Sequence, residues 1–242
     1  MIKKTKAILF ASTVSLATPA FAGESTFIAT ADRPAGNLLG GAHLTVEGGV
    51  WSDFIFRGRE LGDTSGDARA ELIFPLGDSA SLSLGGRYVG GDDYEQSEGF
   101  AAVQQGFGAV TLAAGYRFLG LDAGDRHELG LMLGTQIAGL DWMLSLFHDT
   151  EFSGEYIELA ARKSWSLSEP VSLGLGGGIS AVSDYWVPGS GFNHAFLRLD
   201  LPVSVRDGVT LTPWIAGNFP VDKLDDIQSD EVYGGVSLRL DF

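Results

Sequence analysis

The chain has 242 residues, no cysteine, 34 glycines and a formal net charge of −15 at pH 7. The excess of acidic side chains makes nucleic acid a poor partner, because phosphate binding depends on Lys and Arg. The length suffices for one domain with a large core or for one barrel, and the absence of cysteine suits a protein that folds in an oxidising compartment without disulfides.

The N-terminus carries a targeting pattern. Lys3, Lys4 and Lys6 precede the apolar run AILFASTVSLA, and Ala20-Phe21-Ala22 has the small-x-small form of a signal peptidase site. This pattern predicts a Sec signal peptide over residues 1–22, cleaved after Ala22. The apolar run is too short for a transmembrane helix, which needs about 20 residues. We expect residues 23–42 to form a short periplasmic lead-in and residues 43–242 to form the folded domain.

From residue 43 onward the hydrophobic pattern has a period of two, which is typical of strands with one apolar and one polar face. In the last segment Val236, Leu238 and Leu240 share one face, whereas Ser237 and Arg239 share the other. No stretch is long and apolar enough for a membrane helix. We predict twelve strands, at 43–58, 67–75, 80–90, 97–106, 109–119, 126–138, 140–149, 154–166, 170–182, 193–204, 208–217 and 231–242.

The linkers between these segments alternate between long, acidic ones such as RELGDTSG and tight ones such as GFG and AG. An outer-membrane β-barrel has this alternation, with short periplasmic turns at one rim and longer extracellular loops at the other. We therefore predict an all-β fold, a transmembrane antiparallel barrel of about 12 strands in the Gram-negative outer membrane. A soluble β-barrel or sandwich is the alternative, but the polar face has few of the lysines that a soluble exterior carries.

Alternation on the first predicted strand assigns Phe54 and Phe56 to the lipid, and Asp53 and Arg57 to the lumen. A charge at the bilayer midplane would cost roughly 2–4 kcal/mol, which supports this assignment. We expect partners for Asp53 and Arg57 on the neighbouring strands, at Arg69 and Glu71 or at Arg239 and Asp241. The complete set of predicted pore-lining residues is Glu47, Asp53, Arg57, Arg69, Glu71, Arg87, Arg117, Glu158, Arg162, Arg198, Asp200, Arg239 and Asp241.

Twelve tilted strands enclose a backbone cylinder of roughly 12 Å radius, which favours a narrow water-filled pore. The function predicted from this is diffusion of small hydrophilic solutes or ions through a porin-like channel. Gly174, Gly176 and Gly178 share the inward face of one strand, where they either leave room for the pore or permit curvature. In the alternative, the inward charges pair and fill the lumen, and the barrel is a closed structural protein or an adhesin that acts through its acidic loops.

A lipid-modifying enzyme of the outer membrane is a further alternative. Ser145 and His148 are close in sequence, but strand spacing places them on opposite faces, so they cannot form a nucleophile–base pair without a bulge. There is no GxSxG motif and no HExxH or CxxC pattern. We therefore predict no enzyme, no metal site and no cofactor.

The stretch SDFIFRG, residues 52–58, resembles the first-strand signature S-D-Y-x-F-R-G of the TorF-like family of outer-membrane porins. Phe54 stands where that family has tyrosine, and RGREL follows where it tends to carry a Ser-Gln pair. The resemblance implies an outer-membrane barrel with a channel role. The last residue, Phe242, on an alternating strand, resembles the signal that the barrel-assembly machinery recognises. Outer-membrane lipid and lipopolysaccharide are the other expected partners, and analogy with trimeric porins, which have more strands, suggests a monomer.

Overall fold

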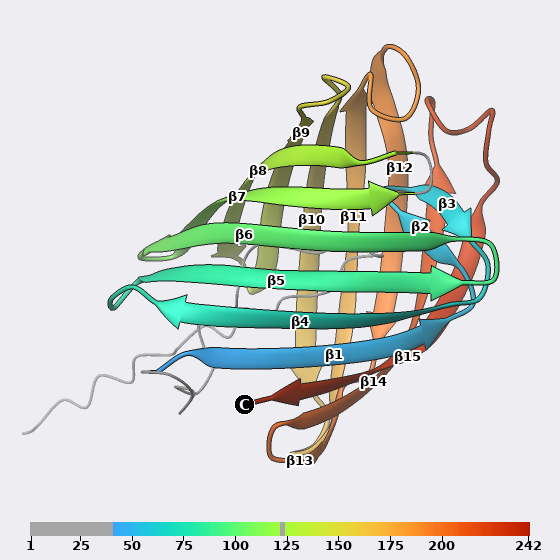
Figure 1. Ribbon diagram of the computed structural model, residues 1–242. Coiled ribbons are helices and arrows are strands. Elements are labelled where there is room, and N and C mark those ends of the chain that lie inside the picture. Colours follow the sequence, from blue (N-terminus) through green and yellow to red (C-terminus); the bar gives the residue numbers. More distant parts are fainter. Residues whose placement is uncertain (1–40, 122–123) are drawn as a thin grey trace, which may run out of the picture.

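The computed structural model describes residues 41–121 and 124–242, and within them every regular element is a β-strand (Figure 1). No helix in this part of the chain is long and apolar enough to cross a membrane. The predicted signal peptide and all but the last two residues of the predicted lead-in lie outside the described residues.

Twelve of the described strands form one closed antiparallel barrel, as predicted. Successive strands pair with each other around the sheet, and the β1–β15 and β12–β14 pairings close the ring. A short strand, β13 (Val203–Arg206), pairs with the start of β14 at a turn. The barrel strands are β1 (His43–Trp51), β4 (Ser65–Pro75), β5 (Ala80–Gly91), β6 (Glu95–Phe107), β7 (Val110–Leu121), β8 (Arg126–Ile137), β9 (Leu140–Asp149), β10 (Glu155–Ser166), β11 (Ser172–Ser183), β12 (Ser190–Asp200), β14 (Val209–Pro220) and β15 (Glu231–Asp241).

Each barrel strand turns its apolar side outward. On β15, Val232 is 70% exposed and Leu238 44%, whereas Tyr233 and Ser237, between them in sequence, are buried in the interior. This distribution is the reverse of that in a soluble protein, and it suits a protein surrounded by hydrocarbon. The pairing of backbone groups around the closed ring suits the same environment, because hydrocarbon offers no hydrogen-bond partners. The longer loops gather at one end of the barrel, which we call the long-loop end.

The first predicted strand is wrong beyond Trp51. Trp51 pairs with Ser65 of β4, so residues 52–64 form a loop at the long-loop end. Within this loop, β2 (Phe54–Phe56) and β3 (Arg59–Gly62) form a separate two-stranded sheet, which we call the inserted hairpin. Phe54 and Phe56, expected to face lipid, are 1% and 0% exposed. They are buried among aromatic side chains of the barrel interior, which satisfies the hydrophobic effect without contact with lipid.

Candidate functional site: the lumen and the inserted hairpin

The inserted hairpin reverses direction at Arg57 and Gly58. Phe56 pairs with Arg59, and the two residues between them have φ angles of +50° and +78°. Two-residue hairpin loops of this type need positive φ at both positions, which glycine adopts readily. A Cβ atom at Gly58 would also overlap the imidazole ring of His194 on β12. The Arg-Gly pair in the SDFIFRG stretch is thus a tight turn that fits closely against the barrel wall.

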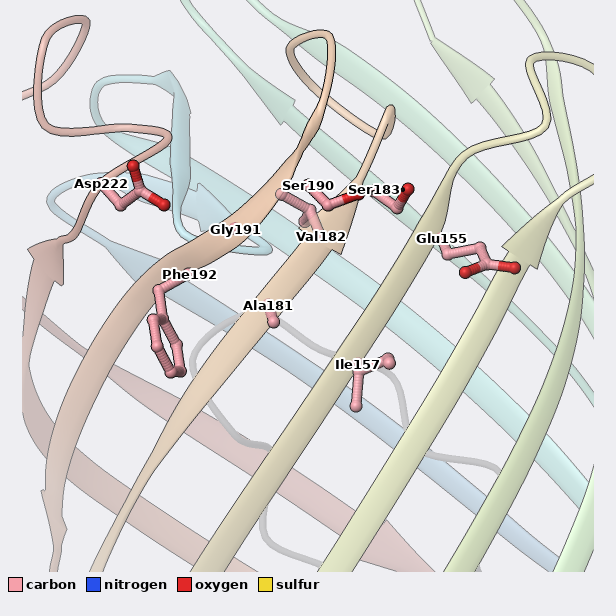
Figure 2. A pocket seen from close by; sticks show the side chains of 9 residues that line it. All are labelled: Glu155, Ile157, Ala181, Val182, Ser183, Ser190, Gly191, Phe192 and Asp222. Carbon is pink, nitrogen blue, oxygen red and sulfur yellow. Dashed lines mark hydrogen bonds between the residues drawn. The ribbon is translucent and has the colours of Figure 1, made fainter.

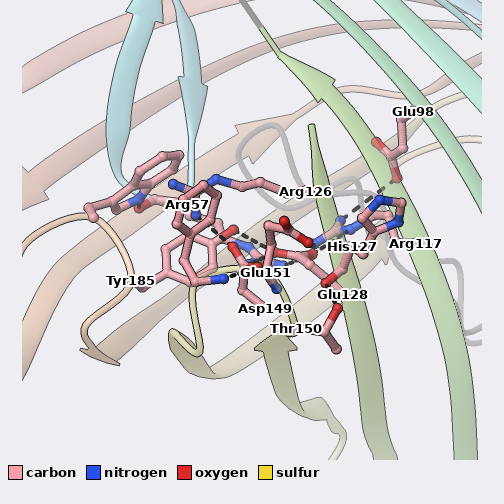
Figure 3. Close-up of polar contacts among 12 residues, drawn as sticks. Arg57, Glu98, Arg117, Arg126, His127, Glu128, Asp149, Thr150, Glu151 and Tyr185 are labelled. Carbon is pink, nitrogen blue, oxygen red and sulfur yellow. Dashed lines mark hydrogen bonds and ion pairs between the residues drawn. The ribbon is translucent and has the colours of Figure 1, made fainter. Parts of the chain in front are cut away.

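The side chain of Arg57 enters a buried pocket beside this turn (Figure 3). Its two terminal nitrogens donate to both oxygens of Glu128 on β8, at 2.6 and 2.9 Å. Arg117 on β7 donates to the same carboxylate at 2.7 and 2.9 Å, and the Tyr185 hydroxyl donates to it at 2.5 Å. Burial raises the pKa of Tyr185, which keeps the hydroxyl protonated as a donor.

Aromatic rings complete the surroundings of the Arg57 guanidinium. Its central carbon lies 4.3 Å from the ring centre of Phe147, and 4.7 Å from those of Tyr156 and Tyr185. Cation–π attraction is strongest when the cation is removed from water, and Arg57 is only 1% exposed. The guanidinium is therefore held both by a carboxylate and by ring faces. We call Glu128, Phe147, Tyr156 and Tyr185 the arginine pocket.

Four further side chains hold the backbone of the turn. The carbonyl of Arg57 accepts from Asn193 at 2.8 Å and from the Trp186 indole at 3.2 Å. The carbonyl of Gly58 accepts from Asn218 at 2.8 Å and from Gln228 at 2.9 Å. Each carbonyl thus receives two donors, so the position of the turn is specified by backbone contacts as well as by Arg57.

These contacts extend across the barrel. Glu128 lies on β8, whereas Asn218 lies on β14, and β9, β10, β11 and β12 separate these two strands in the ring. Phe54 stacks on Tyr94, just before β6, and the Arg87 guanidinium of β5 lies 5.6 Å from the Phe54 ring. Because the hairpin touches walls on nearly opposite sides, it spans the lumen at the long-loop end.

The charges around Arg57 balance. Glu98 lies 3.7 Å from Arg117, and Arg126 donates to Asp149 at 2.9 Å, next to the Arg57–Glu128 pair. Arg57, Arg117 and Arg126 therefore face Glu98, Glu128 and Asp149, with most of these groups fully buried. Balanced, hydrogen-bonded charges avoid the large cost of an isolated buried ion.

The role of the predicted residues as a pore lining stays a prediction, but many of them form ion pairs or hydrogen bonds. Arg57 is buried, and the prediction of a partner on a neighbouring strand is wrong for it, because its partner Glu128 lies on β8. Asp53 is half-buried in the loop after β1, and Glu47 is half-buried on β1. Glu158 accepts from the Tyr156 hydroxyl at 2.5 Å. The ion pairs among the others are Arg69–Glu71 at 3.2 Å, Arg87–Asp67 at 2.9 Å, Arg162–Asp200 at 2.5 Å and Arg239–Asp241 at 2.9 Å.

Arg198 differs from the other inward arginines. No carboxylate oxygen of the described residues lies within 4 Å of its guanidinium, which is stacked over Trp214 at 4.1 Å. The hydroxyl of the adjacent Tyr233 has no hydrogen-bond partner among the described residues. Arg198 is therefore a buried cation inside the barrel that no carboxylate of the described residues neutralises by direct contact.

Three central acids were missed in the sequence analysis, although alternation identifies them. Glu128 shares a face with Arg126, Gly130 and Met132 on β8, opposite Leu129 and Leu131, which are more than half exposed. Glu98 and Asp149 follow from the same rule on β6 and β9. Asp149, at the end of β9 next to a loop, is fully buried and paired with Arg126.

The lumen is narrower than the backbone cylinder suggests. A buried apolar cluster that includes Ile55, Phe100, Met132 and Phe196 lies inside it. Two glycines of β11 lie close to interior side chains, because a Cβ at Gly178 would meet the Phe196 ring and one at Gly174 would meet Arg162 and Asp200. The described interior is thus filled to a large extent by the hairpin and by packed side chains.

Serine and histidine side chains do not form an accessible catalytic pair at the positions considered from sequence. Ser145 is buried inside the barrel, whereas the His148 side chain is 48% exposed on the outside. A different pair, Ser180 and His194, is hydrogen-bonded at 2.6 Å, but both residues are about 2% exposed. Gly58 covers His194, so this pair positions the hairpin.

The outer surface has shallow pockets of its own. One, of about 380 Å³, lies between β10, β11 and β12 near the long-loop end (Figure 2). Ile157 and Phe192 form its apolar part, with Glu155 and Asp222 at the rim. Because Ile157 and Phe192 belong to the outward apolar face, this pocket is separate from the lumen.

No family model matches the chain, and no curated protein matches it. Solved structures match it over most of its length. The KdgM porin has a TM-score of 0.52 at 8% identity, covering 83% of this chain and 99% of its own. The NanC porin has a TM-score of 0.54 at 10% identity, covering 81% and 98%. An outer-membrane channel from Pseudomonas putida F1 has a TM-score of 0.53 at 10% identity, covering 83% and 95%. The chain therefore has the fold of the outer-membrane β-barrels that include porins and channels.

Proposed function

We propose that this protein is an outer-membrane channel for small hydrophilic solutes or ions, whose entrance at the long-loop end is closed by the inserted hairpin. The observation that carries this proposal is the combination of a twelve-strand barrel with a charged inner face and a separate element lying across it. A barrel wall of this size needs no such element for its own closure. The structural likeness to porins and channels supports the same function.

The direct test is planar-bilayer conductance of the refolded protein and of a variant without the hairpin. Trp51 and Ser65 already pair, so replacing residues 53–63 by Asn-Gly leaves a short loop between β1 and β4. We expect rare or small conductance steps from the wild type and frequent, larger steps from the shortened variant. If neither protein conducts above the lipid background while both show β-barrel circular dichroism, the channel function is wrong.

A closed structural barrel is the second candidate, and the buried ion pairs favour it. Arg117 and Glu128 are 0% exposed, and Arg162 and Asp200 pair deeper in the lumen. If this alternative holds, the shortened variant shows no more conductance than the wild type, because side chains of the wall close the lumen without the hairpin.

A further inference from the structure

The inserted hairpin is not part of the barrel wall. Its two strands pair with each other and with no barrel strand, and the ring of twelve strands closes without them. Its tip is held by side-chain contacts at Arg57 and by hydrogen bonds to the carbonyls of Arg57 and Gly58. The hairpin is therefore held in the lumen by side-chain contacts and hydrogen bonds, without strand pairing to the barrel wall.

The arginine pocket has the form of a binding site for a guanidinium group. The Glu128 carboxylate meets the planar fork of Arg57 with two parallel hydrogen bonds. Three ring faces lie within 4.7 Å of the guanidinium carbon. Bidentate pairing and stacking on aromatic faces both select a guanidinium over a compact ammonium ion.

Charge balance depends on the occupant of this pocket. With Arg57 in place, three arginines face three carboxylates. Without it, two arginines, Arg117 and Arg126, share the three carboxylates of Glu98, Glu128 and Asp149, so this group of ion pairs has one excess negative charge. An uncompensated buried charge is costly, so the vacated pocket has a strong requirement for a cation.

The base of the inserted hairpin carries carboxylates that repel one another. Carboxylate atoms of Asp53, Glu60 and Asp63 lie within 4.8 Å of one another. Burial, together with Glu231, Asp53 and Asp63, raises the pKa of Glu60. The inserted position thus combines an attractive contact at the tip with mutual repulsion of carboxylates at the base.

We propose that the arginine pocket is a guanidinium-binding site that Arg57 occupies as a built-in ligand, and that the inserted hairpin is a plug released when Arg57 leaves this site. The plug function rests on the channel function proposed above, whereas guanidinium binding does not.

Binding is tested with Arg57→Ala, in which the pocket is vacant. Arg59→Ala is the matched control, because Arg59 lies two residues away with an exposed side chain outside the pocket. Refolded proteins are titrated with methylguanidinium chloride, and with methylammonium chloride at the same concentrations. We expect methylguanidinium to raise the unfolding temperature of Arg57→Ala in a saturable manner, with little effect of methylammonium and little effect of either ion on Arg59→Ala. Equal responses to both ions, or none, would overturn the guanidinium site.

Release of the plug is tested by trypsin cleavage after Arg59 and by conductance. Cleavage reports the population of the released hairpin when closing is fast. We expect Arg57→Ala to be cut on the order of tenfold faster than wild type, and to open more often in bilayers. Tyr185→Phe keeps the ring but removes a donor to Glu128, and provides a milder variant should Arg57→Ala fold poorly.

The outcomes separate the two proposals. If the variant without the hairpin conducts but Arg57→Ala and Tyr185→Phe behave as wild type in both assays, the proposed release of the plug by Arg57 is wrong. The proposed channel function is then retained. If methylguanidinium stabilises Arg57→Ala but neither that variant nor the shortened one conducts, the binding site stands and the channel is wrong.

Discussion

Arg57 and Glu128 are 71 positions apart in the sequence and form a bidentate ion pair, at 2.6 and 2.9 Å, with both side chains fully buried. The pair connects the tip of a loop to the wall of the barrel. Arg117 shares the same carboxylate, so Glu128 is the common acceptor of two arginines and of Tyr185.

Substituting Glu128 by Gln should destabilise the protein strongly. The change leaves Arg57 and Arg117 buried with one fewer countercharge, and loss of one partner from a buried ion pair costs about 3–5 kcal/mol. Equilibrium unfolding in urea with lipid vesicles measures the loss. Glu155→Gln removes a carboxylate whose side chain is 59% exposed on β10, and should change stability by less than about 1 kcal/mol. Similar losses for both variants would contradict the central role of Glu128.

Substituting Gly58 by Ala should displace the hairpin tip. The new Cβ would overlap His194, and the backbone has φ +78°. Gly139→Ala is a close control, because Gly139 has φ +72° with no atom within 4 Å of the added Cβ. Gly139→Ala should lower the free energy of unfolding by about 1 kcal/mol from backbone strain alone. Gly58→Ala should lower it by more, and should also increase the rate of trypsin cleavage after Arg59. Equal effects would mean that the fit against His194 is unimportant.

The two donors to the Gly58 carbonyl should compensate for each other. Asn218→Ala or Gln228→Ala alone leaves one hydrogen bond and should cost about 1 kcal/mol. The double variant leaves the carbonyl without either side-chain donor, so its loss of stability should exceed the sum of the single losses. A double-mutant cycle on urea unfolding measures this coupling, and strict additivity would argue against a shared acceptor.

The inserted hairpin should be held more firmly in acid. The pKa of Glu60 is raised above 4.5 by burial and by the charges of Glu231, Asp53 and Asp63. The inserted state therefore binds the proton more tightly than the released state, in which the pKa returns toward 4.5. Insertion is most favourable below pH 4.5 and weakens as the pH rises through the raised pKa. Open probability in bilayers should rise over this interval, and Glu60→Gln should flatten the profile. An unchanged profile in that variant would assign the dependence to another group.

Arg198 should favour anions in the opened lumen, because its guanidinium has no carboxylate within 4 Å among the described residues. In the variant without the hairpin, Arg198→Gln should shift the reversal potential in a salt gradient toward cation selectivity. Arg206→Gln, which removes an exposed arginine on β13, serves as the control. An equal shift in both variants would indicate a general effect of net charge.

Period two in the sequence, read together with the alternation of linker lengths, was sufficient to predict the closed barrel and the approximate bounds of most of its strands, but it did not identify all of the charges inside it. Both signals are local: a strand places alternate side chains on opposite faces, and a membrane barrel requires one of those faces to be apolar. The one strand that was misassigned, 43–58, contains the alternation of WSDFIFRG, which is equally typical of a lumenal hairpin and of a membrane strand.

Only the tertiary structure decided where that stretch lies and which groups meet. Trp51 pairs with Ser65, which ends β1 and directs the following residues into the lumen, and this register depends on the pairing of whole strands. Arg57 meets Glu128 because the inserted hairpin, which follows β1, reaches β8, and β4, β5, β6 and β7 separate these two strands in the ring. No local spacing encodes this proximity. The sequence by itself thus determined the wall of the barrel, and long-range packing determined what fills it.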